Sequence, residues 1–153
     1  MTSIEVLKAS SARLSAIVHA TEDPEKVRKA LSTASSRERF SSNSEEWKVK
    51  GHHGNEILVV RMLLPRSQAE PFFESLWKML PRVDQELFLN SIGSYIDHNG
   101  DLHLRLDKQD CFRGNLRLQN VDPIKVQVSF PTRGQSISQM TNQIREKLES
   151  LID

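Results

Sequence analysis

Two neighbouring histidines, His52 and His53, are the residues of this chain that most suggest metal binding or acid–base chemistry. They lie in the segment GHHGNEI, between the strand-like runs WKVK and ILVVRMLL. Side chains of consecutive strand residues point to opposite faces, so two histidines in an extended strand could not bind one metal ion together. Glu56 is the only carboxylate close to them, and no His-x-x-x-His spacing is present. The pattern favours a glycine-bracketed hairpin turn, with Gly51 or Gly54 at positive φ.

Motifs typical of catalysis or cofactor binding are absent from the rest of the sequence. No G-x-S-x-G segment supports a catalytic triad. The run GHHGNE lacks the third glycine and the following helix of a dinucleotide-binding loop. We therefore expect no enzyme activity and no cofactor, with a metal-dependent hydrolase that uses His52 or His53 as an alternative.

The composition is that of an ordinary globular protein. Hydrophobic residues make up 37% of the 153 residues and charged residues 27%, which is unlike a disordered chain. With 21 basic and 20 acidic residues the net charge is +1, so a surface that attracts nucleic acid must be a local patch. The single cysteine, Cys111, excludes an internal disulfide and a cysteine-based zinc site. No apolar run reaches the roughly 18 residues of a membrane span, and we expect a cytoplasmic protein with one domain over residues 1–153.

Hydrophobic periodicity predicts the element order β-α-β-β-α-α-β-β-β-α. The first strand lies in SARLSAIVHA, and Asp23 caps the helix that follows it. We expect a serine-rich loop at 35–46, a Ser67–Glu70 capping box at the second helix, and a closing helix from about Ser136. Three late strands, in DLHLRLDK, NLRLQ and DPIKVQVSF, alternate apolar and polar residues. Strands grouped in this way predict an α+β fold, with a mostly antiparallel sheet and helices layered on one face.

Polar side chains dominate one face of these late strands when their leucines, isoleucine and valines face the helices. The residues expected on or beside this polar face are His103, Arg105, Lys108, Gln109, Arg113, Arg117, Lys125 and Gln127. Basic sheet faces and their loops bind RNA through phosphate contacts and base stacking. Any solvated face of an antiparallel sheet has a similar composition, and no exposed aromatic residue is interleaved with these cations. The residues alone are compatible with RNA binding without demonstrating it.

Four segments resemble the landmarks of an archaeal family described as RNA-binding, or predicted exosome subunit. They are HATEDPEKVRKAL at 19–31, GHHGN at 51–55, LHLRLDKQDCFRG at 102–114 and DPIKVQV at 122–128. The resemblance implies a small α+β protein whose fold is similar to that of the ribosomal protein that holds the 5S RNA. Cys111 departs from the family pattern, because small residues are usual at its position.

Together with the basic face, this resemblance gives a hypothesis for an RNA-binding site. Its expected members are His52, His53, Asn55, Arg105, Lys108, Gln109, Arg113, Arg117 and Lys125. In this hypothesis Arg105 and Lys108 contact phosphates, while Asn55 or Gln109 reads a base edge or a 2′-hydroxyl. The chain would then be a non-catalytic RNA-binding protein and an accessory of exosome-linked RNA processing.

The same sequence features predict which partners the protein binds. RNA is the suspected partner, together with subunits of an RNA-processing complex. A homodimer is a further expectation, because exposed edge strands need covering. The alternative function is a protein-interaction subunit that docks a partner without contacting RNA. Metal-dependent hydrolysis is the second alternative.

Replacing both His52 and His53 by Ala is expected to leave the fold intact. Surface substitutions rarely change the free energy of unfolding by more than about 1 kcal/mol. Urea unfolding of the wild type and the double variant measures the difference. Stoichiometric zinc in the purified wild type, lost from the variant, would contradict the hairpin interpretation.

Overall fold

The computed structural model describes residues 7–35 and 43–152, which form five strands, five α-helices and one short 3-10 helix. The strands are β1 (Ser11–Val18), β2 (Asn43–Lys50), β3 (Glu56–Leu64), β4 (Leu102–Leu106) and β5 (Ile124–Ser129). The helices are α1 (Pro24–Ala34), α2 (Arg66–Met79), α3 (Arg82–Asn90), the 3-10 helix η1 (Ile92–Tyr95), α4 (Lys108–Phe112) and α5 (Ile137–Ser150). Within these residues, no helix combines the length and the apolar character needed to cross a membrane.

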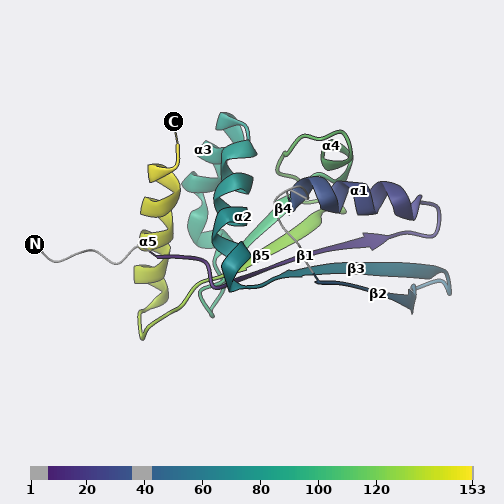
Figure 1. The fold of residues 1–153 in the computed structure, drawn as a ribbon, viewed down its shortest axis with the longest axis horizontal. Coiled ribbons are helices and arrows are strands. Elements are labelled where there is room, and N and C mark those ends of the chain that lie inside the picture. Colours follow the sequence, from purple (N-terminus) through teal and green to yellow (C-terminus); the bar gives the residue numbers. More distant parts are fainter. Residues whose placement is uncertain (1–6, 36–42, 153) are drawn as a thin grey trace, which may run out of the picture.

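The strands form one sheet in the order β2-β3-β1-β5-β4, and each neighbouring pair is antiparallel. Helices α1 to α4 lie above the strands in Figure 1, and α5 stands at the left end of this helical layer, where Trp77 of α2 contacts it. The predicted α+β fold, with an antiparallel sheet and helices on one face, is confirmed. We call the side of the sheet that carries no helix the open face.

The alternation in β1 explains how one strand serves both sides of the sheet. Leu14 and Val18 are buried beneath the helices, together with Ala12 and Ala16. Arg13, Ser15 and Ile17 lie between these positions and point to the open face. Each large apolar side chain that leaves water contributes about 1.5–3 kcal/mol to the stability of the fold.

Aromatic side chains connect the helical layer to the sheet. The rings of Phe73 and Phe130 meet edge to face at 5.5 Å between centroids, and those of Trp77 and Phe88 at 5.8 Å. The indole N–H of Trp77 donates a hydrogen bond of 3.1 Å to the carbonyl of Leu148 in α5. This bond satisfies the only polar atom of a fully buried indole, so α2 and α5 are held in one register.

The predicted capping box at the second helix is wrong. Helix α2 begins one residue before Ser67, with Pro65 at the N-cap position, so the hydroxyl of Ser67 lies inside the first turn. Glu70 has a different role, since it accepts a 2.8 Å hydrogen bond from the backbone N–H of Ala9 and pairs with Lys147 of α5. It therefore joins the chain before β1 to the last helix.

The serine-rich loop expected at 35–46 is also longer than the structure allows. Residues 43–46 belong to β2 and pair with β3, while 36–42 lie outside the described residues. Glu46 accepts hydrogen bonds of 2.9 and 2.7 Å from the guanidinium of Arg28 in α1. The polar composition of this segment is explained by an edge strand, whose residues are exposed from 44 to 50.

The strand expected in NLRLQ is reduced to a single bridge between Leu118 and Leu106. The backbone N–H of Leu118 donates to the carboxylate of Asp84 in α3 at 3.0 Å, and so it cannot extend a ladder. Sequence periodicity shows which residues of this segment are apolar. It does not show that Asp84 accepts a hydrogen bond from the backbone of this segment.

Helix α4 is not predicted from the sequence, because the strand-like segment DLHLRLDK extends to its first residue, Lys108. The carboxylate of Asp107 accepts hydrogen bonds from the backbone N–H groups of Gln109 and Asp110, at 2.8 and 3.1 Å. An aspartate at an N-cap is a standard helix-start signal, and it redirects the chain immediately after β4.

The thiol of Cys111 in α4 should be chemically inert in the folded protein. Its side chain is fully buried, and burial, with the nearby charges of Asp107 and Asp110, raises the pKa of this thiol to about 12. Since the thiolate is the reactive form, reaction with an aromatic disulfide reagent at pH 8 should be far slower in native than in urea-denatured protein. Rapid stoichiometric labelling of the native protein would contradict this prediction.

Candidate functional site

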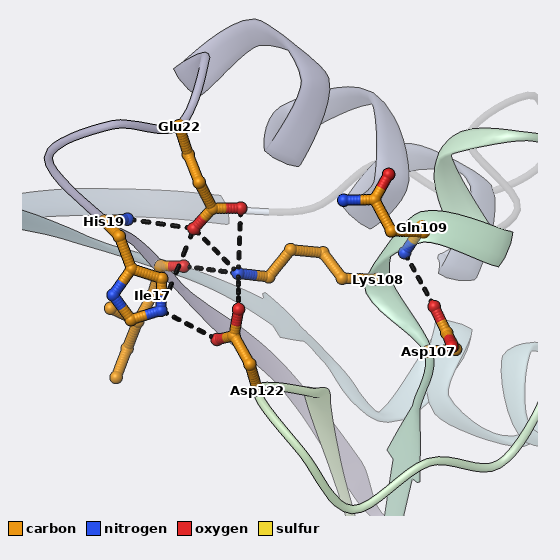
Figure 2. A network of polar contacts seen from close by, with 7 residues as sticks. All are labelled: Ile17, His19, Glu22, Asp107, Lys108, Gln109 and Asp122. Atoms are coloured by element: carbon orange, nitrogen blue, oxygen red, sulfur yellow. Dashed lines mark hydrogen bonds and ion pairs between the residues drawn. The ribbon is translucent and has the colours of Figure 1, made fainter.

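A buried ammonium group ties together segments at one end of the sheet. The side chain of Lys108, at the first residue of α4, is only 6% exposed. Its Nζ donates to the backbone carbonyl of Ile17 at 2.8 Å, to Glu22 at 3.1 Å and to Asp122 at 3.0 Å (Figure 2). The three donors of the ammonium therefore have three acceptors from different parts of the chain. Lys108 was expected at the surface, and this expectation is wrong.

His19 extends the same network at its exposed side. Its Nε2 lies 3.0 Å from Oδ1 of Asp122, and its backbone N–H donates to Glu22 at 3.0 Å. Burial acts to raise the pKa of Asp122, but hydrogen bonds from His19 and Lys108 outweigh it and lower this pKa. Asp122 also has a φ of 45°, a left-handed conformation that aspartate adopts more readily than most residues.

One group of metal-ligating side chains occurs in the described part of the chain, and it is the trio His19, Glu22 and Asp122. The ammonium of Lys108 already sits between its two carboxylates and supplies the positive charge. The geometry is therefore that of a structural ion-pair network.

The Lys108 network holds several segments of the chain next to one another. It joins the end of β1, the segment before α1, the start of α4 and the segment before β5 (Figure 2). Gln109, the next residue, is exposed and lines a depression of about 290 Å³ with Thr21 and Lys26, between α1 and α4. Lys108 and Gln109 are thus neighbours in sequence with different environments.

The open face carries a group of cations on three adjacent strands. Arg13 is on β1, Lys125 on β5 and Arg105 on β4, and the last two stand directly opposite each other. All three are exposed, and within the described residues none makes a side-chain hydrogen bond or an ion pair. The predicted exposure of Arg105 and Lys125 on one sheet face is confirmed, and Arg13 joins them.

The other predicted polar residues of this face are engaged by carboxylates near the turn that precedes β4. His103 Nε2 lies 2.7 Å from Asp97, and the amide of Gln127 donates to Asp101 at 3.0 Å. Although burial acts to raise it, the contacts with His103 and two backbone N–H groups lower the pKa of Asp97. The cationic part of the open face therefore ends at this acidic border.

Two predicted arginines lie elsewhere. Arg117 pairs with Asp84 of α3 at 3.1 Å, which places it beside the helical layer rather than with Arg105. Its expected position on the basic sheet face is wrong, because the segment that contains it, 115–119, forms only an isolated bridge and no strand of the sheet. Arg113 is exposed at the C-cap of α4, also away from the sheet.

Trp47 is another residue of the open face that the sequence pattern did not identify. Its side chain is 40% exposed, and the guanidinium of Arg61 lies 5.2 Å from its ring. This aromatic residue stands beside a cation of β3, on strands outside the group of late-strand cations considered in the sequence. The signal was present in EEWKVK, where Trp47 and Val49 alternate with lysines, and pairing with β3 places both on the open face.

The residues of the GHHGN segment form the tip of the β2–β3 hairpin. Gly51 N–H donates to the carbonyl of Asn55 at 2.6 Å, and Gly54 has a φ of 80°, as the predicted turn requires. The rings of His52 and His53 are exposed and meet edge to face at 5.5 Å. Neither ring belongs to the group of metal-ligating side chains found in the described residues. Their sequence interpretation as a polar hairpin tip agrees with this geometry.

The fold and the open face together define a small α+β protein whose sheet has one covered side and one exposed, cationic side. The family described as RNA binding matches residues 11–130, and the chain belongs to this family. The resemblance to an archaeal RNA-binding family is therefore confirmed.

Relatives extend over nearly the whole chain. An RNA-binding protein of Pyrococcus abyssi is 31% identical over 151 residues, which are 94% of this chain and 96% of the relative. A DUF54 protein of Archaeoglobus fulgidus has a solved structure with a TM-score of 0.80 and 33% identity, covering 91% of this chain and 99% of that one. A DUF54 protein of Sulfolobus solfataricus gives a TM-score of 0.76 and 28% identity, covering 94% of this chain and 100% of that one.

Replacing Lys108 by Met should lower the free energy of unfolding by about 2–3 kcal/mol at pH 7. Glu22 and Asp122 would lose their cation, although their partial exposure keeps the loss below that of a fully buried pair. The folded pKa of Asp122 is lowered, so its stabilisation is present above its unfolded pKa of about 4 and is lost as the pH falls through the folded pKa. The difference between wild type and variant should therefore shrink below about pH 4 in urea unfolding.

Lys50→Met is the matched control, because Lys50 is an exposed lysine at the end of β2. Its free energy of unfolding should change by no more than about 0.5 kcal/mol. Equal losses in the two variants would show that the network does not stabilise the fold.

Proposed function

We propose that this chain is a non-catalytic RNA-binding protein that binds the phosphate backbone on its open face. The observation that carries the proposal is a group of exposed cations on adjacent strands, Arg13, Arg105 and Lys125, whose side chains have no ion-pair partner among residues 7–35 and 43–152. Family membership and the name of the Pyrococcus relative support RNA as the ligand.

The placement of two of these cations is unfavourable without a ligand. Arg105 and Lys125 are directly opposite each other on β4 and β5, and like charges at such positions destabilise a sheet. A phosphate between them would relieve this repulsion and release the counterions of the RNA. Neighbouring strands are about 4.8 Å apart, so side chains on β1, β5 and β4 offer a row of contacts across the sheet. The folded protein tolerates this repulsion, and an anionic ligand between the two cations would replace it by attraction.

No bond-making role is part of this proposal. The ionisable residues gathered around Lys108 are committed to the fold, because Lys108 holds Glu22 and Asp122 in a structural network. The buried thiol of Cys111 has a raised pKa, which removes it as a nucleophile at neutral pH. As part of the same proposal, the protein acts in the cytoplasm as an accessory of exosome-linked RNA processing.

Partner docking is the second candidate function, favoured by one observation. β2 lies at the edge of the sheet and exposes Trp47 and Val49. An exposed edge strand is a template for pairing with another chain, such as a second copy of this protein or a subunit of a processing complex.

Replacing Arg105 and Lys125 together by Ala should weaken RNA binding and reduce its dependence on salt. Each lost phosphate contact should make the slope of log K against log salt shallower by about 0.7 for a single strand. Fluorescence anisotropy with a labelled RNA at several salt concentrations measures both effects. Lys108 is kept in this test, because its replacement would disturb the fold.

The matched control is the double variant Arg66→Ala and Arg145→Ala. These exposed arginines lie on α2 and α5, in the helical layer, and removing them changes the net charge by the same amount. The control should bind nearly as well as the wild type. Equal losses from the two double variants would mean diffuse attraction rather than a site on the open face. An absence of RNA binding by the wild type at low salt would favour the docking function.

A further inference from the structure

The open face contains a depression that is large enough for a small ligand. Its volume is about 580 Å³, and it lies where β1, β3, β4 and β5 meet the segment before β5. Ile17, Val59 and Pro123 give it apolar walls, and Arg105 and Lys125 stand at its cationic side. A cavity with apolar walls and a few convergent polar groups is the usual form of a small-ligand site.

An apolar strip leads from the edge of the sheet to this depression. Trp47 on β2 pairs with Val59 on β3, and Val59 pairs with Ile17 on β1, so the three side chains form one row across the open face. Trp47 and Ile17 are 40% and 37% exposed. Arg61 stacks over the indole of Trp47 and also pairs with Glu45, which restrains the orientation of the ring. The strip is thus an exposed apolar surface with a held aromatic group at its outer end.

We infer that this strip and depression take unpaired bases, so that the RNA bound on the open face is single-stranded. The inference rests on the proposed function and names its ligand class. In an A-form duplex the base faces are hidden in the stack, and a protein reaches mainly phosphates and 2′-hydroxyls. In a single strand the bases are free to stack on an aromatic ring or an apolar wall, while cations beside them hold the phosphates. The apolar row and the cationic group lie side by side on this face, which suits both parts of a nucleotide.

The charges around the strip favour RNA over a second protein chain. Arg105 and Lys125 are unpaired within the described residues, whereas the acidic groups nearby are engaged. Asp122 contacts Lys108 and His19, and Glu45 pairs with Arg61. The surface available to a ligand is therefore positive beside an apolar strip.

The Lys108 network makes the depression rigid before a ligand arrives. It binds the carbonyl of Ile17, which lies in one wall, and the carboxylate of Asp122, which lies in another (Figure 2). Asn120 is on the same rim, and its side-chain amide can donate to and accept from the edge of a base. Fixed walls reduce the ordering cost of binding.

Tryptophan fluorescence offers a direct test, because the chain has two tryptophans and they differ in environment. Trp47 is partly exposed on the strip, whereas Trp77 is fully buried and hydrogen-bonded to Leu148. A ten-nucleotide single-stranded RNA should quench the emission of the wild type as bases stack on Trp47, and a duplex of the same length should not. Trp47→Ala should lose about tenfold in affinity for the single strand and little for the duplex. Trp47→Phe, which keeps an aromatic ring, should retain most of the affinity.

Leu87→Ala is the control, since Leu87 is an exposed apolar residue on α3, in the helical layer. It should bind both RNAs as the wild type does. Salt-sensitive RNA binding without quenching, unchanged in Trp47→Ala, would overturn the inference and leave the proposed function standing. No RNA binding by the wild type would remove both. A lower oligomeric state in Trp47→Ala by sedimentation, with unchanged single-strand affinity, would overturn the inference and assign the strip to a protein interface.

Discussion

The arrangement of this protein depends on one ammonium group that is kept away from water. Lys108 cannot be buried without acceptors, because an unpaired buried charge is strongly unfavourable. Its three acceptors come from the end of β1, the segment before α1 and the segment before β5, which are distant in sequence. A single charge thus requires these segments to meet, and their meeting closes one end of the sheet.

This closed end determines what the open face can present. The helices occupy the other side of the sheet, so strand alternation leaves half of the β-residues to solvent. Where β1 ends, the backbone carbonyl of Ile17 accepts a hydrogen bond from Lys108, while the Ile17 side chain lies on the open face. One residue thus serves the structural network through its backbone and the open face through its side chain.

The sequence was sufficient for those features that depend on local pattern. The Asp23 cap of α1, the apolar stripe of that helix and the Gly54 turn all follow from short-range rules, and the structure has them. Features that depend on a distant acceptor could not be predicted in the same way. Lys108 looked like a surface cation because Glu22 and Asp122 are 86 and 14 residues away along the chain.

Arg117 and Trp47 illustrate two further limits. Arg117 was assigned to the sheet face by its alternation with leucines, but its partner Asp84 belongs to α3. For Trp47 the alternation was visible, yet the face to which it points depends on pairing with β3. Arg105 and Lys125 were placed correctly because both lie in strands whose opposite face is strongly apolar. Alternation with a period of two residues shows which face of the sheet a side chain occupies only when the residues of the opposite face are clearly apolar.

The division of β1 and β5 into covered and open positions also affects how such a protein can diverge. Leu14 and Val126 are paired on the covered side and contribute to the core, while Arg13 and Lys125 occupy adjacent positions on the other side. A mutation at an open position leaves the core residue beside it undisturbed, so it changes the surface at little cost in stability. Descendants of one ancestral chain can therefore exchange what they recognise through single codon changes, while the set of residues that specifies folding is inherited intact.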